Sequence, residues 1–319
     1  HPSMTTILIT EWMPAEVDRL AAAGKVTYDP ALWRDRPRLF ELLAGCEALV
    51  VRNQTQVNAE LLAHAPNLKV VGRLGVGLDN LDLRALRERG VTVVTGGHAN
   101  AISVAEYAFG AMLALARKLP AADRSTKSGG WDRATFGVGT ELCGKTLGLI
   151  GLGDIGARVA KRAVAFGMQV VAHDPLITPL HFAAAEFNVP LLSLDEVLRA
   201  SDFVSLHVPL SPATANLINA GRLAMMKPTA ILINTSRGGI VDEAALAEAL
   251  RTGRLGGAAL DVRAHEPPGS HDPLAVLDNV LLTPHIAGLT AESQARVCAA
   301  VADDVLRVLR GGKPLFAVQ

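Results

Sequence analysis

The sequence alternates short apolar runs with longer helical patterns, and this alternation constrains the fold more than any other feature. The runs are rich in Val, Ile and Leu, and they predict strands at Thr6–Thr10, Ala48–Val51, Lys69–Val71, Val91–Val94, Thr146–Ile150, Gln169–Ala172, Phe203–Leu206, Ala230–Ile233, Ala258–Leu260 and Val280–Leu282. Strands that are almost continuously apolar are buried on both faces, as in a parallel sheet that helices cover. Strands that alternate with helices imply right-handed βαβ crossovers. We therefore expect an α/β protein built from doubly wound parallel sheets.

The length of the chain and an irregular stretch near its middle predict two domains. A chain of 319 residues is too long for one ordinary core. Residues 120–145 are rich in Gly, Ser, Thr and charge, which indicates irregular chain between a helix at about 101–118 and a second series of strands from Thr146. An amphipathic helix at about 291–310 follows that series, and we expect it to return to the first one. The expected domains are 4–99 with 289–319, and 100–288 inserted between them.

Charge, hydropathy and cysteine content exclude several classes of function. Lys and Arg number 31, as do Asp and Glu, so the net charge is zero and the chain lacks the basic field of a nucleic-acid-binding protein. The best apolar stretch, Tyr107–Ala116, is far shorter than the roughly 20 residues that span a membrane, and Ile7–Ile9 is too short for a secretory signal. Three scattered cysteines, Cys46, Cys143 and Cys298, predict neither a disulfide framework nor a metal site. We expect a reduced, cytoplasmic protein with no metal, no nucleic-acid partner and no membrane association.

A glycine-rich turn follows the expected strand at 146–150. Gly151, Gly153 and Gly156 form a Gly-x-Gly-x-x-Gly motif, with Asp154 and Ile155 inside it, directly before a helical pattern. In that context the first glycine permits a tight turn, the second lets the backbone approach a pyrophosphate, and the third allows close helix–strand packing. The helix N-terminus then presents free N–H groups to the phosphates. The motif predicts a dinucleotide site.

Asp174 stands 18 positions after Gly156, at the end of the next expected strand. This position matches the carboxylate that binds the ribose 2′-hydroxyl of NAD, and a carboxylate there would repel the 2′-phosphate of NADP. No Arg or Lys follows in Pro175–Ile177. The sequence therefore favours NAD, with an aspartate that merely starts a turn as the alternative.

Three segments of the second series carry the candidate catalytic residues. Arg237 follows a buried strand, and a guanidinium there can clamp a carboxylate in bidentate fashion. Glu266 and His285 follow the next two expected strands, and the carboxyl ends of parallel strands share the edge where ligands bind. A carboxylate that holds one imidazole nitrogen favours the protonated ring and leaves the other N–H to protonate a substrate oxygen. A solvated arginine and a structural histidine are the alternatives, and the competing histidines are His98, His207, His265 and His271.

Taken together, these segments resemble the D-isomer-specific 2-hydroxyacid dehydrogenases, in their phosphoglycerate-dehydrogenase-like branch. The matching motifs keep the family's order over about residues 70–288, and they are Val70–Asn80, Asn100–Glu106, Gly144–Gly153, Asn234–Glu243 and Thr283–Gly288. The resemblance implies a Rossmann-type NAD domain inserted into a flavodoxin-like substrate domain. It also implies a homodimer, for which the apolar helix at 101–118 and the following segment 120–145 are the candidate contact.

The resemblance implies that Arg237, Glu266 and His285 form the family's catalytic triad. The implied reaction is reversible hydride transfer between NAD(H) and C2 of a small 2-hydroxy or 2-oxo acid. Arg237 would bind the C1 carboxylate, and His285, supported by Glu266, would exchange a proton with the C2 oxygen. The residues expected around the cofactor are Gly151, Gly153, Asp154, Ile155 and Gly156 in the loop, Asp174 at the ribose, His207 and Pro209 on the adenosine side, Thr235 and Ser236 along the groove, Asp261 near the nicotinamide carboxamide, and Gly288.

The chain departs from the family pattern before two of these residues. The family commonly has an aromatic where His173 stands, and an aromatic and an acid in the segment that here reads Arg263-Ala264-His265. The sequence leaves open whether His265 reaches the site. Longer members append a regulatory domain, and because this chain stops after its last expected helix we expect no feedback through such a domain.

Two further cations point to the substrate. Arg52 and Arg73 both follow expected strands of the first series, and the backbone N–H groups of Gly75, Val76 and Gly77 could form an anion nest. Such a set suits an acid with a second anionic group, of the 3-phosphoglycerate or sulfolactate type. The alternative is that Arg73 packs under a loop and Arg52 is solvated. Glyoxylate and hydroxypyruvate are simpler substrates, and an NAD-sensing corepressor-like protein or a formate or phosphite dehydrogenase are the rival functions.

Overall fold

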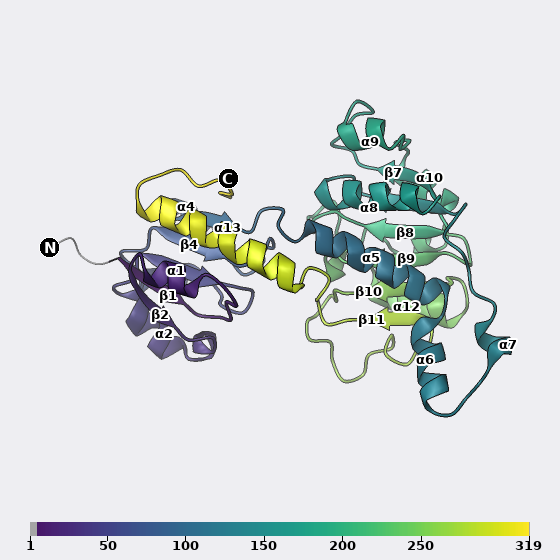
Figure 1. Ribbon diagram of the computed structural model, residues 1–319, viewed down its shortest axis with the longest axis horizontal. Coiled ribbons are helices and arrows are strands. Elements are labelled where there is room, and N and C mark those ends of the chain that lie inside the picture. Colours follow the sequence, from purple (N-terminus) through teal and green to yellow (C-terminus); the bar gives the residue numbers. More distant parts are fainter. Residues whose placement is uncertain (1–4, 319) are drawn as a thin grey trace. The chain divides into compact units, whose positions relative to one another are not determined.

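The computed structural model describes residues 5–318, which divide into two compact units. The first unit consists of the described residues through Asn100 and those from Leu289 onward, and the second unit is Ala101–Gly288 (Figure 1). Met4 and Gln319, the outer ends of the expected first domain, lie outside the described residues.

The first unit contains a parallel sheet of five strands. They are β1 (Thr6–Ile9), β2 (Lys25–Tyr28), β3 (Ala48–Val51), β4 (Val70–Arg73) and β5 (Thr92–Thr95). Their order is β2-β1-β3-β4-β5, which is the flavodoxin-like arrangement. The helices are α1 (Val17–Ala21), η1 (Leu32–Arg34), α2 (Arg36–Leu43), α3 (Ala59–Ala63), α4 (Leu83–Glu88) and α13 (Ala291–Leu309).

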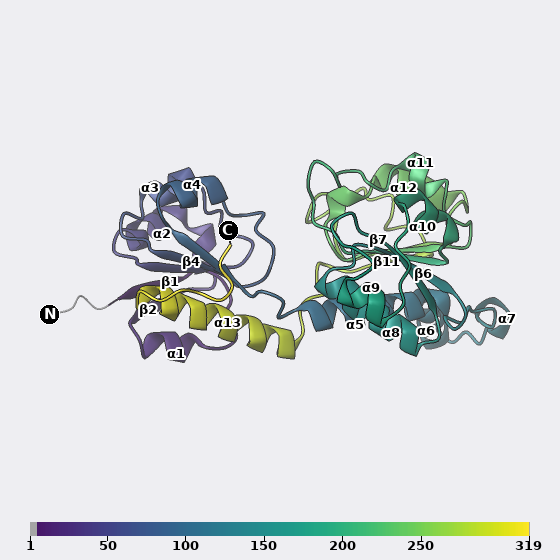
Figure 2. The ribbon, with the colours of Figure 1, turned by 90° about the horizontal axis from the view of Figure 1, so that it is seen from above.

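The last helix, α13, covers one face of this sheet beside α1, while α2, α3 and α4 cover the other (Figure 2). Val297, Val301 and Val305 of α13 are buried against apolar residues of β1, β3 and β4. The packing is close, because a Cβ added to Gly72 of β4 would lie 2.7 Å from Val301 Cγ1. The sequence predicted this return of the final helix, and the contacts of α13 with β4 and β5 confirm it.

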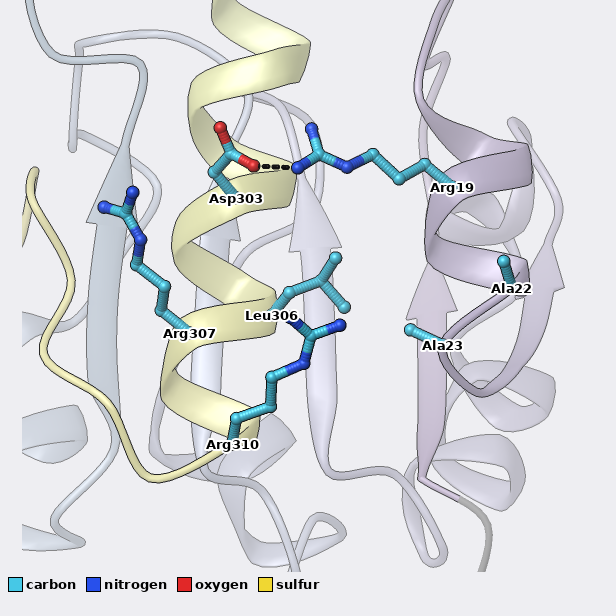
Figure 3. Close-up of a pocket in the computed structure, with 7 residues that line it drawn as sticks. All are labelled: Arg19, Ala22, Ala23, Asp303, Leu306, Arg307 and Arg310. Carbon is cyan, nitrogen blue, oxygen red and sulfur yellow. Dashed lines mark hydrogen bonds and ion pairs between the residues drawn. The ribbon is translucent and has the colours of Figure 1, made fainter.

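An ion pair between Arg19 of α1 and Asp303 of α13 joins the two helices at the surface (Figure 3). It borders a hollow that also exposes Arg307 and Arg310. Both partners of the pair are solvent-exposed, so the pair contributes at most about 1 kcal/mol. None of the predicted site residues lines this hollow.

The second unit contains a parallel sheet of six strands. They are β6 (Thr146–Ile150), β7 (Gln169–His173), β8 (Phe203–Leu206), β9 (Ile231–Asn234), β10 (Gly257–Leu260) and β11 (Val280–Leu282). Their order is β11-β10-β9-β8-β6-β7, and a short bridge from Ala172 to Leu191 extends the sheet beyond β7. The chain therefore reverses direction across the sheet between β6 and β8, as in a Rossmann fold, where dinucleotides bind at that switch point.

Helices cover both faces of the second sheet (Figure 2). One apolar cluster lies under α5, α8 and α9, and the other under α10, α11 and α12. The helices are α5 (Ala101–Ala116), α6 (Leu119–Lys127), α7 (Arg133–Phe136), α8 (Asp154–Ala165), α9 (Phe182–Glu186), α10 (Leu194–Ala200), α11 (Ala220–Leu223), η2 (Gly238–Ile240) and α12 (Glu243–Arg251). Among residues 5–318, no helix combines the length and the apolar character that crossing a bilayer requires.

The structure differs from the sequence expectations in two segments. Strand β2 was not expected, because it lies at the sheet edge, half exposed, and lacks a continuous apolar run. Residues 120–145 are not wholly irregular, since α6 occupies part of them and α7 follows. Neither of these two helices buries a residue, and both lie in a stretch whose Gly, Ser, Thr and charged residues predicted irregular chain.

Candidate active site

The candidate site of the second unit is built at the carboxyl ends of its strands. The loop after β6 carries the glycine motif, and Asp174 follows β7. Arg237, Glu266 and His285 follow β9, β10 and β11, which are neighbours in the sheet. The prediction that these three loops share one edge of the sheet is confirmed.

The glycine loop is shaped by close backbone contacts. Gly151 has φ of 92°, and a Cβ added to it would lie 2.3 Å from the carbonyl oxygen of His207. A Cβ on Gly156 would lie 2.3 Å from the carbonyl oxygen of Gly151. At Gly153 an added Cβ would meet nothing within 4 Å. The space in front of Gly153, at the start of α8, therefore fits a pyrophosphate.

Asp174 is held against this loop. Its Oδ2 accepts a hydrogen bond from Leu152 N and its Oδ1 accepts one from Leu176 N, both at 2.9 Å. The second bond is the turn that the sequence offered as an alternative, and the first ties the carboxylate to the glycine loop. A carboxylate has about four acceptor positions, so it can still accept hydroxyl groups of a ribose.

Two buried polar atoms in the segments that follow β8 and β9 lack a hydrogen-bond partner among the described residues: His207 Nδ1 and Thr235 Oγ1. The other ring nitrogen of His207 lies 2.9 Å from Ser205 Oγ, and burial lowers the pKa of His207 to about 4. Ser236 Oγ donates to the carbonyl oxygen of Leu206 at 2.7 Å. Buried polar groups without a partner are rare in proteins, so these atoms fit a site that receives a polar ligand.

Other residues expected at the cofactor have structural partners. Asp154 begins α8 and pairs with Arg158 Nε at 3.3 Å, where an acid complements the helix dipole. Ile155 packs against the apolar core. Pro209 accepts a hydrogen bond from Thr214 Oγ1 through its carbonyl oxygen at 2.5 Å. Their contacts with a cofactor, like that of Gly288, remain predictions.

His285 and Glu266 form a hydrogen-bonded pair. His285 Nδ1 lies 2.8 Å from Glu266 Oε2, and both side chains are partly exposed. His285 has φ of 57°, and its backbone N–H donates to the carbonyl oxygen of Asp261 at 2.8 Å. With Nδ1–H donating to the carboxylate, Nε2 is the ring nitrogen available to a substrate.

The loop that carries His285 is fixed from below by Asp261. This carboxylate is 1% exposed and accepts hydrogen bonds from Ile286 N, Ala287 N and Thr283 Oγ1 at 2.6–2.8 Å. Tyr107 of α5 lies 2.5 Å from Thr283 through its hydroxyl, and burial raises the pKa of Tyr107. Asp261 therefore orients the histidine loop, a role that the sequence analysis did not predict, while its place near the nicotinamide carboxamide stays a prediction.

Arg237 follows β9 in extended conformation. Its Nη1 donates to the carbonyl oxygen of Ser236 at 2.7 Å, and its carbonyl oxygen accepts from Asn234 Nδ2 at 2.9 Å. A Cβ added to Gly238 would lie 1.9 Å from the carbonyl carbon of Arg263. The Arg237 segment thus packs directly on the backbone that leads to Glu266.

The predicted substrate cations lie in the first unit and are both held by neighbours. Arg52 donates from Nε to the carbonyl oxygen of Trp12 and from Nη2 to Gln294 Oε1, each at 2.5 Å, and burial lowers its pKa. Arg73 Nη1 donates to the carbonyl oxygen of Leu74 at 2.8 Å. Gly75 has φ of 149°, which strains any other residue, and the place of an added Cβ lies 2.0 Å from Arg73 Nη1. Arg52 is consequently not a freely solvated side chain, and Arg73 packs against the loop that contains Gly75, Val76 and Gly77.

Comparison with known proteins relates the chain to a protein family. Residues 109–287 match the family model described as D-isomer specific 2-hydroxyacid dehydrogenase, NAD binding domain. The chain is 47% identical over 276 residues to D-3-phosphoglycerate dehydrogenase from Archaeoglobus fulgidus, an alignment that covers 86% of this chain and 52% of that protein. It is 46% identical over 307 residues to (S)-sulfolactate dehydrogenase from Chromohalobacter salexigens, covering 96% and 99%.

Solved structures show the same architecture. The TT0316 protein from Thermus thermophilus superimposes with a TM-score of 0.91 at 38% identity, over 99% of this chain and all of that one. The chain spans about half the length of the phosphoglycerate dehydrogenase relative, and nearly all of the sulfolactate dehydrogenase relative.

Proposed function

The chain belongs to the D-isomer-specific 2-hydroxyacid dehydrogenase family, and from that premise we propose that it transfers a hydride between NAD(H) and C2 of a small 2-hydroxy or 2-oxo acid. The observation that carries this proposal is the hydrogen bond of 2.8 Å between His285 and Glu266 at the edge of the sheet that also bears the glycine loop. The second unit is the NAD-binding domain, and the first unit is proposed as the substrate domain.

A bound nicotinamide dinucleotide supplies the hydride donor or acceptor. The glycine loop and the N-terminus of α8 would hold its pyrophosphate, and Asp174 would hold the adenosine ribose. The same carboxylate would repel a 2′-phosphate, which selects NAD over NADP. His207 and Thr235 would offer their unpartnered polar atoms to the groove.

Acid–base chemistry belongs to His285. Its Nδ1–H is committed to Glu266, which holds the ring in one orientation. Nε2 donates a proton to the C2 oxygen during reduction and accepts it during oxidation. Arg237 binds the C1 carboxylate and polarises the C2 oxygen, because its guanidinium presents paired N–H donors.

The proposed substrate carries a second anion, as 3-phosphohydroxypyruvate or sulfopyruvate does. Arg52 and Arg73 are its proposed receptors, with the Gly75–Gly77 backbone. The two curated relatives reported above are named for acids of this kind, which supports the choice. Glyoxylate and hydroxypyruvate, which lack the second anion, are the competing substrates.

We also propose a homodimer in the cytoplasm. Trp131, Leu119 and Val138 are exposed in the segment that follows α5, and Trp131 is 81% exposed. This segment is the proposed association surface, because exposed apolar residues favour burial at an interface. Helix α5, the other part of the predicted contact, has most of its apolar residues buried in the core of the second unit, so it is not the exposed apolar helix that the sequence suggested. The three cysteines are free thiols, as in a reducing compartment.

The test is a steady-state screen of NADH oxidation, followed at 340 nm, with phosphorylated, sulfonated and simple 2-oxo acids. The proposal expects turnover, with the highest kcat/KM for a dianionic acid and at least a tenfold loss of it in Arg52→Ala. Binding of NADH without turnover of any acid would identify a sensor instead. Equal kcat/KM for glyoxylate and the dianionic acids would contradict the proposal that the enzyme recognises a second anionic group.

A further inference from the structure

We propose that Arg263 is a positioning residue for the His285–Glu266 pair, anchored by Glu243 and Asp272. This inference rests on the proposed function, because it concerns the same proton transfer. It assigns a purpose to the segment Arg263-Ala264-His265, which precedes Glu266.

Arg263 makes a partly buried double ion pair. Its Nη1 and Nη2 lie 2.5 and 2.9 Å from the two carboxylate oxygens of Asp272. Its Nε and Nη2 lie 3.3 and 2.9 Å from the two oxygens of Glu243. The side chains of Arg263 and Asp272 are each 9% exposed. Hydrogen bonding to Asp272 and Glu243 raises the pKa of Arg263, so the guanidinium is a fixed cation held by two bidentate partners.

The backbone of the same residue reaches the catalytic carboxylate. Arg263 N donates to Glu266 Oε1 at 3.0 Å, while Glu266 Oε2 lies 2.8 Å from His285 Nδ1. Glu243 Oε1 also accepts from Ala264 N at 2.6 Å, which fixes the next peptide group. The ion pair therefore sets the direction of the N–H that orients Glu266.

Burial alone does not orient the pair. Glu266 and His285 have side-chain exposures of 37% and 45%, so hydrogen bonds contribute more to their orientation than packing does. The clamp also reaches the third catalytic residue, because the Arg237-Gly238 segment packs on the Arg263 backbone and leads into Glu243 at the start of α12. The Arg263 guanidinium thus links Glu243, in the segment after β9, to Asp272, in the segment between β10 and β11.

The ion pairs of Arg263 with Glu243 and Asp272, here called the clamp, contribute more to orientation than to the free energy of folding. Removing three charged groups from water offsets most of their attraction, and an apolar replacement of a buried ion triad is often neutral or stabilising. Removing Arg263 alone would leave two carboxylates close together and uncompensated, which is strongly destabilising. The informative variant therefore neutralises all three residues at once.

The test compares the wild type with the triple variant Glu243→Gln, Arg263→Met and Asp272→Asn, and with Arg263→Lys. Arg251→Met is the matched control, since it removes an exposed ion pair with Glu248 on α12. The triple variant should bind NADH normally and keep KM within about threefold, while kcat for reduction falls about tenfold or more. Arg263→Lys should be intermediate, and Arg251→Met should be unchanged.

The pH profile separates positioning from a general structural role. A misdirected Glu266 stabilises the imidazolium less, so the loss of reductase activity at high pH should move to lower pH in the triple variant. The charged and titratable groups on the segments that contact the pair are Tyr107, Arg237, Glu243, Asp261, Arg263, His265 and Asp272, and only the three substituted ones differ in this comparison. In proton NMR, the downfield Nδ1–H resonance of His285 should be present in the wild type and lost in the triple variant.

A folded triple variant with the wild-type kcat, pH profile and Nδ1–H resonance would overturn the clamp and leave the proposed function intact. If the triple variant does not fold, the same three readouts on Arg263→Lys decide, and wild-type values there overturn the clamp. If the wild type turns over no 2-oxo acid, the proposed function fails, whereas the NMR resonance still reports whether Arg263 orients the pair.

Discussion

Two loops at the same sheet edge are held by different forces. The loop at 151–156 is shaped by backbone contacts, with Gly151 and Gly156 each placed where a Cβ would meet a carbonyl oxygen at 2.3 Å. The loop after β10 is held by side-chain charges, with Arg263 between Glu243 and Asp272. Close backbone contact tolerates no substitution, while an ion-pair clamp tolerates coordinated replacement. The first arrangement suits a binding cradle, and the second suits the fine orientation of a reacting group.

We expect the largest effect when the acid–base group itself is removed. His285→Asn should lower kcat about 10³-fold with little change in NADH affinity, because a general acid of this kind contributes about 10²–10⁴-fold. Glu266→Gln keeps the acceptor oxygen and removes the charge, so its loss should be about tenfold to a hundredfold. Steady-state rates and NADH fluorescence titrations measure both. Equal activity of His285→Asn and wild type would remove His285 from the reaction.

The next largest effect concerns the glycine loop, which is shaped by backbone contacts. Two glycine-to-alanine substitutions in this loop form a matched pair. Gly151→Ala should abolish NADH binding and destabilise the second unit by more than about 2 kcal/mol, because of its positive φ and the contact with His207. Gly153→Ala meets no protein atom within 4 Å, so it should fold normally and weaken NADH binding only. Urea unfolding and isothermal titration give the two quantities. Unchanged NADH affinity in Gly153→Ala would mean that the phosphates lie elsewhere.

A smaller effect concerns the choice of cofactor. Asp174→Ala should weaken NAD binding about tenfold or more and leave NADP binding unchanged or improved, because the variant loses a ribose acceptor and a charge that repels phosphate. The variant also loses the hydrogen bond to Leu152 N, which affects both dinucleotides alike. Titration with each dinucleotide gives the ratio. Equal losses for both would assign Asp174 to loop structure alone.

The last effect is a pH dependence of stability at His207, the residue whose carbonyl oxygen lies against Gly151. Burial lowers the pKa of His207 to about 4, below the ordinary value of 6.5, so the unfolded chain takes up a proton first as the pH falls. Stability from this group is complete above about pH 6.5 and decreases as the pH approaches 4. The decrease should reach about 2 kcal/mol at pH 5. His207→Asn should show a correspondingly smaller difference between urea unfolding at pH 7.5 and at pH 5, and an identical difference would contradict the burial of a neutral ring.

The two loops also differ in how much of them could be predicted from the sequence. The glycines at 151, 153 and 156 form a short motif directly after a strand, so a dinucleotide site could be predicted from neighbouring residues alone, although the contact of Gly151 with His207 could not. The pairing of Glu266 with His285 was predicted from the order of strands, and the structure contains it. The Arg263 clamp depends on partners 20 and 9 positions away, whose proximity only the folded chain creates. Strand β2 and helices α6 and α7 escaped prediction because little of their surface is buried.

The central claim is that this chain moves a hydride to C2 while its own imidazole supplies the proton. Reduction of a dianionic 2-oxo acid with NADH deuterated at both C4 positions tests it most directly. The account predicts a 2-hydroxy acid with one deuterium at C2, formed by the wild type and about 10³-fold more slowly by His285→Asn. A product without deuterium at C2, or no product with any 2-oxo acid, would contradict it.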